Sequence, residues 1–133
     1  MAQAETKRKK ILIVEDEEYL RDALAINLSD EGFEVSKAGN GIEGLETALK
    51  EHPDFVLIDI IMPEMDGIAM LKKMREDSWG KDADVMLLTN LSSMDKIADA
   101  AEYNAKEYLI KADLTLAQIT EKIKEKFRLL EAK

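Results

Sequence analysis

Short, unbroken apolar runs divide the sequence, and they constrain its fold more than any other feature. A strand with one face in water alternates apolar and polar residues, whereas a strand covered on both faces is apolar throughout, as in a parallel sheet. A weaker run covers residues 33–36. The strong runs are residues 11–14, 55–58, 85–88 and 108–110. They predict the buried strands of a parallel sheet.

The segments that follow these runs have helical periodicity. Apolar residues recur three or four positions apart after each run; Ile42, Leu45 and Leu49, for example, mark the second helix. Ser92 or Ser93 is expected to cap the fourth helix. Alternating strands and helices with right-handed crossovers form a doubly wound sheet. We therefore predict an α/β fold of the (βα)5 type, a flavodoxin-like five-stranded parallel sheet in the order 2-1-3-4-5.

Length and composition limit the function. With 133 residues, the chain is expected to form one domain over residues 9–133, after a flexible leader at 1–8. It has no Cys, which excludes disulfides and thiolate metal sites. A net charge of −9 argues against direct nucleic-acid binding. The sequence has no signal peptide or apolar run of membrane length, so we expect a cytoplasmic location without membrane attachment.

Polar side chains follow the predicted strands at the same end. Glu15 and Asp16 follow the first strand, Asp59 the third, Thr89 the fourth and Lys111 the fifth. Open parallel sheets bind ligands at the carboxyl ends of their strands, above all where the strand order reverses. In the order 2-1-3-4-5 this point lies between strands one and three. The three carboxylates are therefore expected to meet there.

Three carboxylates in one pocket need a compensating cation. Two unit charges about 5 Å apart repel by roughly 3 kcal/mol at an effective dielectric constant of about 20. Mg²⁺ prefers oxygen ligands and keeps waters that a phosphate can replace. A carboxylate is also a nucleophile toward phosphorus. With the ammonium of Lys111 and the hydroxyl of Thr89 expected nearby, the pattern predicts a phosphoryl acceptor at Asp59.

One stretch of the sequence is more specific than the rest. Residues 59–67 read DIIMPEMDG. Glu15 and Asp16 lie 44 and 43 residues before Asp59, Thr89 lies 30 residues after it, and Lys111 lies 22 residues after Thr89. This combination resembles the receiver domains of bacterial two-component response regulators, whose phosphoacceptor Asp is followed by an M-P-x-x-[DN]-G loop. The resemblance extends from about residue 9 to about residue 130.

The resemblance implies a role for each residue at these strand ends. Thr89 and Lys111 would bind the phosphoryl oxygens. The metal ligands would be Asp16, Asp59, the backbone carbonyl of Ile61 and, through water, Glu15.

The resemblance also implies partners. A histidine kinase or histidine phosphotransfer protein would supply the phosphoryl group. A downstream protein would bind at the fourth helix, fifth strand and fifth helix, and a phosphorylation-dependent homodimer is left open. Tyr108 matches the aromatic residue that turns inward as Thr89 moves toward the phosphoryl group. The domain would be a switch that assists only its own phosphorylation and dephosphorylation, not an enzyme acting on other substrates.

Two positions depart from the family pattern. Ala112 follows Lys111 where proline is usual, and we expect a trans peptide bond between them because a cis bond without proline is costly. Asn90 stands where a very small residue is common, and it is expected to narrow access to the site. The apolar Ile61 and Leu91 are expected to overhang the phosphoryl group and shield it from water.

Three other functions fit parts of this pattern. A haloacid-dehalogenase-type phosphatase would carry a second Asp two residues after the nucleophile, where this chain has Ile61. A nucleotide-binding domain would carry a glycine-rich first turn, whereas residues 15–18 are all acidic. The receiver half of a truncated DNA-binding transcription regulator would have the same sequence features, so that alternative remains open.

Two aromatic rings lie outside the predicted site. Trp79 lies between the third helix and the fourth strand, so we expect it at the opposite end of the sheet from the carboxylates. His52 precedes Pro53 at a helix end and has no partner at metal-ligand spacing. It is expected to be structural.

Overall fold

The computed structural model describes residues 9–131, and these form the predicted sheet. Its five parallel strands lie in the order β2-β1-β3-β4-β5. They are β1 (Lys10–Val14), β2 (Glu34–Ala38), β3 (Phe55–Asp59), β4 (Val85–Thr89) and β5 (Tyr108–Ile110). The order reverses between β1 and β3, as predicted. The predicted leader at residues 1–8 lies outside the described residues.

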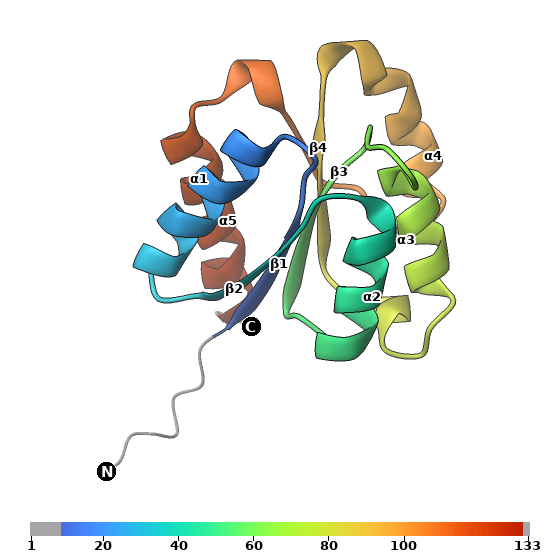
Figure 1. The fold of residues 1–133 in the computed structure, drawn as a ribbon, viewed down its shortest axis with the longest axis horizontal. Helices are drawn as coiled ribbons and strands as arrows, with labels where there is room; N and C mark the ends of the chain where they lie inside the picture. The colour runs from blue at the N-terminus through green and yellow to red at the C-terminus, as the bar shows by residue number, and fades with distance from the viewer. Residues whose placement is uncertain (1–8, 132–133) are drawn as a thin grey trace.

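Helices follow the strands and cover both faces of the sheet. The α-helices are α1 (Glu18–Asp30), α2 (Gly41–Glu51), α3 (Gly67–Arg75), α4 (Ile97–Ala101) and α5 (Leu116–Glu131). Short 3-10 helices are η2 (Gly80–Asp82), η3 (Leu91–Lys96) and η4 (Lys111–Asp113). Figure 1 shows α1 and α5 on one face and α2, α3 and α4 on the other. Within the part of the chain that the structure describes, no helix is long and apolar enough to span a bilayer.

Alternate residues of the central strands supply the two halves of the core. Along β1, Ile11 and Ile13 pack in the cluster that α1 and α5 complete, whereas Leu12 and Val14 pack in the cluster that α2 and α3 complete. Successive side chains of a strand point to opposite faces, so a strand covered on both faces is apolar at every position. This is why the sequence runs are unbroken.

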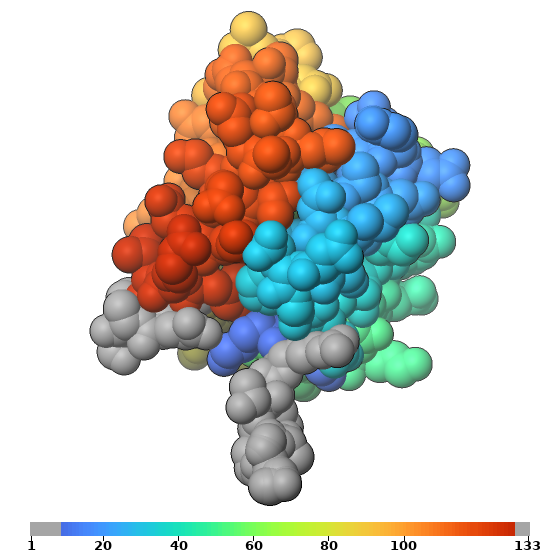
Figure 2. Space-filling view, turned by 90° about the vertical axis from the view of Figure 1, so that its left-hand side faces the viewer, coloured from blue at the N-terminus to red at the C-terminus, as the bar shows by residue number. Residues whose placement is uncertain are grey.

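The helices α1 and α5 lie side by side and form one surface of the molecule (Figure 2). The side-chain amide of Asn27 donates to Oγ1 of Thr120 at 3.5 Å. Nζ of Lys124 lies 3.0 Å from a carboxylate oxygen of Glu31. These contacts tie α5 to α1, and they thereby anchor the helix that follows the loop containing Lys111.

The second helix is where the sequence predicts it, but it buries different residues. Ile42 and Leu49 are exposed, whereas Gly44 and Ala48 face the sheet. A Cβ atom at Gly44 would lie 2.8 Å from the side chain of Val14. Because the helix approaches the sheet this closely, only small residues fit beneath it. The predicted helix is confirmed, but of its three large apolar residues only Leu45 packs against the core, whereas Ile42 and Leu49 lie at the rim.

The fourth helix begins later than predicted, and its predicted caps were wrong. Ser92 and Ser93 lie inside η3, and α4 follows Lys96 without a side-chain capping bond. The backbone N–H of Ser93 donates to the carbonyl of Asn90 at 3.0 Å. This i to i−3 bond winds the segment with three residues per turn, so a serine there caps no α-helix.

Trp79 lies at the amino ends of the strands, as predicted. Its ring stacks on that of His52, with centroids 4.8 Å apart and planes 8° from parallel. His52 ends α2 in the left-handed region, with φ of 51°, shortly before β3 begins. The guanidinium of Arg75 donates to the carbonyls of Gly80, Ala83, Tyr103 and Asn104. These contacts close the end of the sheet opposite the carboxylates.

Candidate functional site

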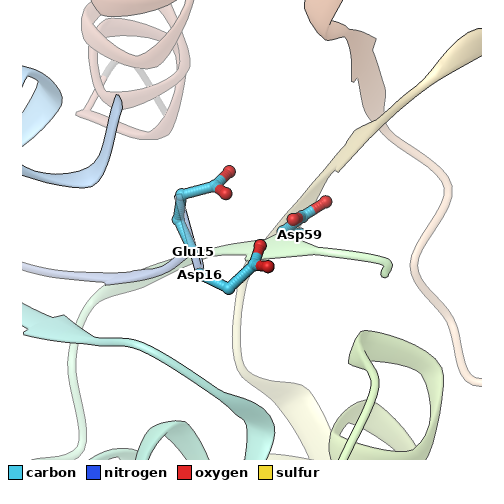
Figure 3. A group of neighbouring side chains, drawn as sticks. All are labelled: Glu15, Asp16 and Asp59. Atoms are coloured by element: carbon cyan, nitrogen blue, oxygen red, sulfur yellow. The ribbon is translucent and has the colours of Figure 1, made fainter. Parts of the chain in front are cut away.

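Three carboxylates meet at the carboxyl ends of β1 and β3 (Figure 3). Glu15 and Asp16 directly follow β1, and Asp59 is the last residue of β3. One oxygen from each of the three lies within 4.8 Å of the others. Val14 pairs with Ile58 in the sheet, so the two strands end at the same level. The predicted meeting of the carboxylates at the switch point is confirmed.

The two neighbours after β1 have different environments. Glu15 is fully buried, whereas Asp16 is exposed. One carboxylate oxygen of Glu15 accepts the backbone N–H of Glu17 at 2.9 Å. The guanidinium of Arg21 donates to the backbone carbonyl of Glu15 at 3.0 Å. Glu15 is thus held at its side chain and at its main chain.

Lys111 links two of the carboxylates. Its Nζ lies 2.8 Å from Oε1 of Glu15 and 3.2 Å from Oδ2 of Asp59. The ammonium donates a hydrogen bond to Asp59. Oε1 of Glu15 has no aligned donor among the described residues, so its contact with Lys111 is an ion pair. No peptide bond in residues 9–131 is cis, so the bond between Lys111 and Ala112 is trans, as predicted.

Burial and like charge make Asp59 a weak acid. Burial, together with the negative charge of Glu15, raises the pKa of Asp59 to about 8 against the opposing ammonium of Lys111. Burial also raises the pKa of Glu15. Burial by itself lowers the pKa of Lys111, but the two carboxylates outweigh it and raise that pKa. The site therefore favours a further positive charge beside Asp59.

The donor set fits a hard divalent cation. Its ligand atoms are carboxylate oxygens, without Cys or His, which suits Mg²⁺ rather than Zn²⁺. Asp16 is exposed, so its side of the cluster is open to solvent and to a hydrated ion. The acidic cluster is thus a site suited to Mg²⁺.

The loop between β3 and α3 is held closely against the end of β3. The N–H of Gly67 donates to the carbonyl of Ile60 at 2.8 Å. A Cβ atom at Gly67 would lie 2.3 Å from the carbonyl oxygen of Asp59, so only glycine fits there. Asp66 caps α3 through a bond from the N–H of Ala69 at 2.8 Å. The Asp-Gly pair that ends the motif is therefore explained by local geometry.

The predicted switch residues lie on neighbouring strands. Thr89 is the last residue of β4 and is fully buried, and its hydroxyl donates to the carbonyl of Asn90 at 2.9 Å. Tyr108 is the first residue of β5, and it is 39% exposed. In this structure the hydroxyl bonds to its own loop, and the aromatic ring is partly in solvent.

The residues predicted to limit access are all exposed. Ile61 lies in the loop after β3 with 44% of its surface exposed. Leu91 begins η3 and is 71% exposed. Asn90 lies between Thr89 and Leu91 and is also exposed. These side chains occupy the loops that follow the strands of the site.

Sequence reasoning missed two residues near the site. Arg21, six positions after Glu15, holds the main chain of Glu15, and no motif marks it. Gly41 is the first residue of α2, and its N–H donates to the carbonyl of Met65 at 3.1 Å. A glycine in the first turn of a helix is a signal of close backbone approach, which could have identified this contact.

The fold and the site together define a class of protein. Its members are doubly wound α/β proteins with a cluster of carboxylates, suited to a bound cation, at the switch point of a parallel sheet. Residues 11–124 match the family described as the response regulator receiver domain. The chain therefore belongs to the receiver domains of response regulators, the phosphorylation-controlled switches of two-component signalling.

Individual relatives and structures agree with this family. The chain is similar to the regulatory protein AtoC of Escherichia coli, with 41% identity over 80% of this chain and 23% of that protein. It is 31% identical to the DNA-binding dual master transcriptional regulator RpaA of Synechocystis, over 77% of this chain and 42% of that protein. The chain thus spans less than half the length of these relatives.

Two solved structures have the same fold. The chemotaxis response regulator CheY4 of Vibrio cholerae has a TM-score of 0.81 and 28% identity, covering 90% of this chain and 98% of that one. A CheY-like receiver domain protein of Methanospirillum hungatei has a TM-score of 0.83 and 29% identity, covering 95% of this chain and 98% of that one.

Proposed function

We propose that this protein is a signalling switch whose phosphoryl acceptor is Asp59. The observation that carries the proposal is the cluster at the switch point. It places Asp59 beside two further carboxylates and 3.2 Å from the ammonium of Lys111. Lys111 supplies one positive charge beside this carboxylate, and a metal ion bound at the cluster would supply a second for the charge of an incoming phosphoryl group.

In the proposed reaction, a carboxylate oxygen of Asp59 bonds to phosphorus as the bond from phosphorus to the donor's imidazole nitrogen breaks. Lys111 then leaves Asp59 for the phosphoryl oxygens but keeps its ion pair with Glu15. Thr89 exchanges its bond to the Asn90 carbonyl for one to a phosphoryl oxygen. The domain thereby assists its own phosphorylation and dephosphorylation and acts on no other substrate.

The proposed metal site uses oxygen atoms from two loops. Bound Mg²⁺ would neutralise charge that develops on the phosphoryl group. Its ligands would be Asp16, Asp59, the backbone carbonyl of Ile61 and, through water, Glu15. The exposure of Asp16 supports a direct ligand there, and the burial of Glu15 beside Lys111 supports an indirect one.

The phosphoryl donor in this proposal is a histidine kinase or a histidine phosphotransfer protein. The proposed location is the cytoplasm, where ATP is available to such kinases.

The output surface in this proposal is formed by α4, β5 and α5. The partly exposed Tyr108 supports it, together with the groove that Tyr108, Lys106 and Lys122 line between β5 and α5. Movement of Thr89 would draw Tyr108 inward and change this surface for a downstream partner or for a second copy of the chain.

A second candidate is the receiver half of a longer DNA-binding regulator. The relatives support it, because several are named transcriptional regulators and this chain spans 42% of RpaA. In that case the same phosphorylation at Asp59 would control an attached DNA-binding domain, and the receiver itself would contact no DNA.

The proposal is tested by phosphorylation with acetyl phosphate and Mg²⁺. Intact-mass measurement should find one added phosphoryl group on the wild type and none on Asp59→Asn. Asp82→Asn, which changes an exposed carboxylate at the other end of the sheet, should be labelled like the wild type. Labelling of Asp59→Asn, or wild-type labelling that persists in EDTA, would contradict the proposal.

A further inference from the structure

Two segments carry the acidic site, the one after β1 and the one after β3, here called its two arms. The main chain of the connection between β2 and α2 is hydrogen-bonded to both. The carbonyl of Ala38 accepts the N–H of Glu15 at 3.0 Å, at the arm after β1. The N–H of Gly41 donates to the carbonyl of Met65 at 3.1 Å, in the arm after β3. Residues 38–41, here called the bridging segment, therefore connect the arm of Glu15 and Asp16 to the arm that follows Asp59.

Gly41 contacts the second arm without space for a side chain. A Cβ atom at this position would lie 2.2 Å from the carbonyl oxygen of Met65 and 2.8 Å from its carbonyl carbon. Both are backbone atoms, so no side-chain rotation relieves the overlap. Figure 1 shows the start of α2 close to the loop after β3, in agreement with this contact.

The start of α2 is fixed, so the loop after β3 must give way. The side chain of Asn40 caps the helix by accepting the N–H of Glu43 at 2.9 Å. One turn later, Gly44 already lies against Val14 of the sheet. A larger residue at position 41 therefore displaces Met65 more readily than it displaces the helix.

Hydrogen bonds hold both ends of this loop, so the displacement of Met65 is passed on to the other residues of the loop. The N–H of Ile60 donates to the carbonyl of Leu88 at 3.0 Å, and Gly67 donates back to Ile60 at 2.8 Å. The residues between them, which include Ile61, form a short closed loop directly after Asp59. Because β1 and β3 are paired directly, moving Met65 displaces the loop that includes Ile61 relative to Asp16.

We propose that Gly41 is a positioning residue for the metal site, because its close contact with Met65 sets the position of the loop after Asp59, which carries the Ile61 carbonyl, relative to Asp16. This inference rests on the proposed function, since it concerns the Mg²⁺ site of that switch. Gly41 touches no ligand atom itself, and it acts through the main chain of Met65.

A second glycine provides a matched control. A Cβ atom at Gly80 would lie 2.0 Å from the carbonyl oxygen of Met74 and 2.8 Å from its carbonyl carbon, nearly the same overlap as at Gly41. Gly80 lies in η2 at the amino ends of the strands, beside Trp79. Gly41→Ala and Gly80→Ala thus introduce the same atom against the same kind of backbone at opposite ends of the sheet.

The experiment measures Mg²⁺ affinity by titration calorimetry on wild type, Gly41→Ala and Gly80→Ala, with urea unfolding of each. Loss of a group that orients ligands typically weakens metal binding about 10- to 100-fold, so Gly41→Ala should bind at least about tenfold more weakly. Gly80→Ala should bind like the wild type, even where urea shows a comparable loss of stability. Equal affinity of Gly41→Ala and wild type, or equal weakening by both substitutions, would overturn the inference.

A milder pair covers the case in which Gly41→Ala does not fold. Asn40→Ala removes the cap beside Gly41, and Thr115→Ala removes the equivalent side-chain bond at the start of α5, from the N–H of Gln118 at 3.1 Å. Asn40→Ala should weaken Mg²⁺ binding and Thr115→Ala should not, and identical affinities would overturn the inference.

Absence of Mg²⁺ binding by the wild type would overturn the proposed function and this inference together. Equal binding by wild type and variants would overturn the inference alone.

Discussion

Asp59 binds its proton more tightly in the folded protein than in an unfolded chain. Burial and the charge of Glu15 raise its pKa from the ordinary 3.8 to about 8. Between these values the folded state holds a proton that the unfolded state has released. Stability contributed by this group is therefore complete below about pH 4 and is lost as the pH rises toward 8.

We predict that Asp59→Asn removes this loss. The quantity to compare is the free energy of unfolding of the variant minus that of the wild type, measured in buffer with EDTA. This difference should be larger at pH 8 than at pH 5. The extra gain should be about 1 kcal/mol or more, since one pKa unit corresponds to about 1.4 kcal/mol. Urea unfolding at the two pH values measures it. A difference between the proteins that is the same at both pH values would contradict the prediction.

At the level of single residues, the sequence predicted which carboxylates meet but not how they differ. The resemblance implied only that Glu15 would hold the metal through water, and it did not indicate that Glu15 is fully buried against Lys111. The reason is the period of two along a strand, which puts neighbours on opposite faces. Sequence spacing places both residues at the end of β1, but only the packed structure shows that Asp16 is the neighbour left exposed.

Two loops border the site, one after β3 and one after β4, and each presents an exposed apolar side chain. Ile61 and Leu91 are 44% and 71% exposed. An apolar side chain beside the phosphoryl group orients no water, whereas a polar one can place a water in line for attack on phosphorus. If Asp59 is the phosphoryl acceptor, as proposed, these loops would affect how long the phosphorylated state lasts.

We predict that the wild-type phosphoprotein with Mg²⁺ is long-lived, and that Ile61→Asn and Leu91→Glu each hydrolyse about three- to tenfold faster, a barrier change of roughly 1 kcal/mol. Ile26→Asn, which changes an exposed apolar residue of α1, is the control and should decay like the wild type. The measurement is loss of the phosphorylated mass over time. If the wild type decays as fast as both loop variants, the two side chains do not shield the site.

At the level of elements, the sheet was more predictable than the helices. Buried parallel strands need unbroken apolar runs, so four of the five strands have a direct signature, whereas the edge strand β2 reads EVSKA and gives a weaker one. A helix can instead pack through small residues, as α2 does with Gly44 and Ala48, and then some of its larger apolar residues, here Ile42 and Leu49, are exposed. In the segment after β4, i to i−3 bonds compete with α-helical ones, and the sequence pattern does not distinguish the two.

In the whole molecule, the residues of the candidate site lie at one end of the parallel sheet, and the contacts that close the structure lie at the other end. The carboxylates, Thr89 and Lys111 follow the carboxyl ends of the strands, whereas Trp79 and His52 stack near the amino ends. The sequence predicted this separation because every strand of a parallel sheet runs the same way, so the side of each connection follows from its place in the chain. The Arg75 hydrogen bonds that close the far end carry no sequence motif, and only the structure identifies them.

Because of this separation, the fluorescence of Trp79 should report unfolding of the protein without responding to metal binding at the site. We predict that saturating Mg²⁺ leaves the fluorescence of the folded protein nearly unchanged, because the ring packs against His52 at the opposite end from the ligands. The same Mg²⁺ should raise the urea midpoint of the Trp79 signal, because a ligand that binds only the folded state at 100 times its Kd stabilises it by about 2.7 kcal/mol. Asp16→Asn, which lacks a proposed ligand, should lose most of that shift. Strong quenching of the folded protein by Mg²⁺ would place Trp79 beside the pocket, and an unchanged midpoint would show that the carboxylates at the switch point bind no metal.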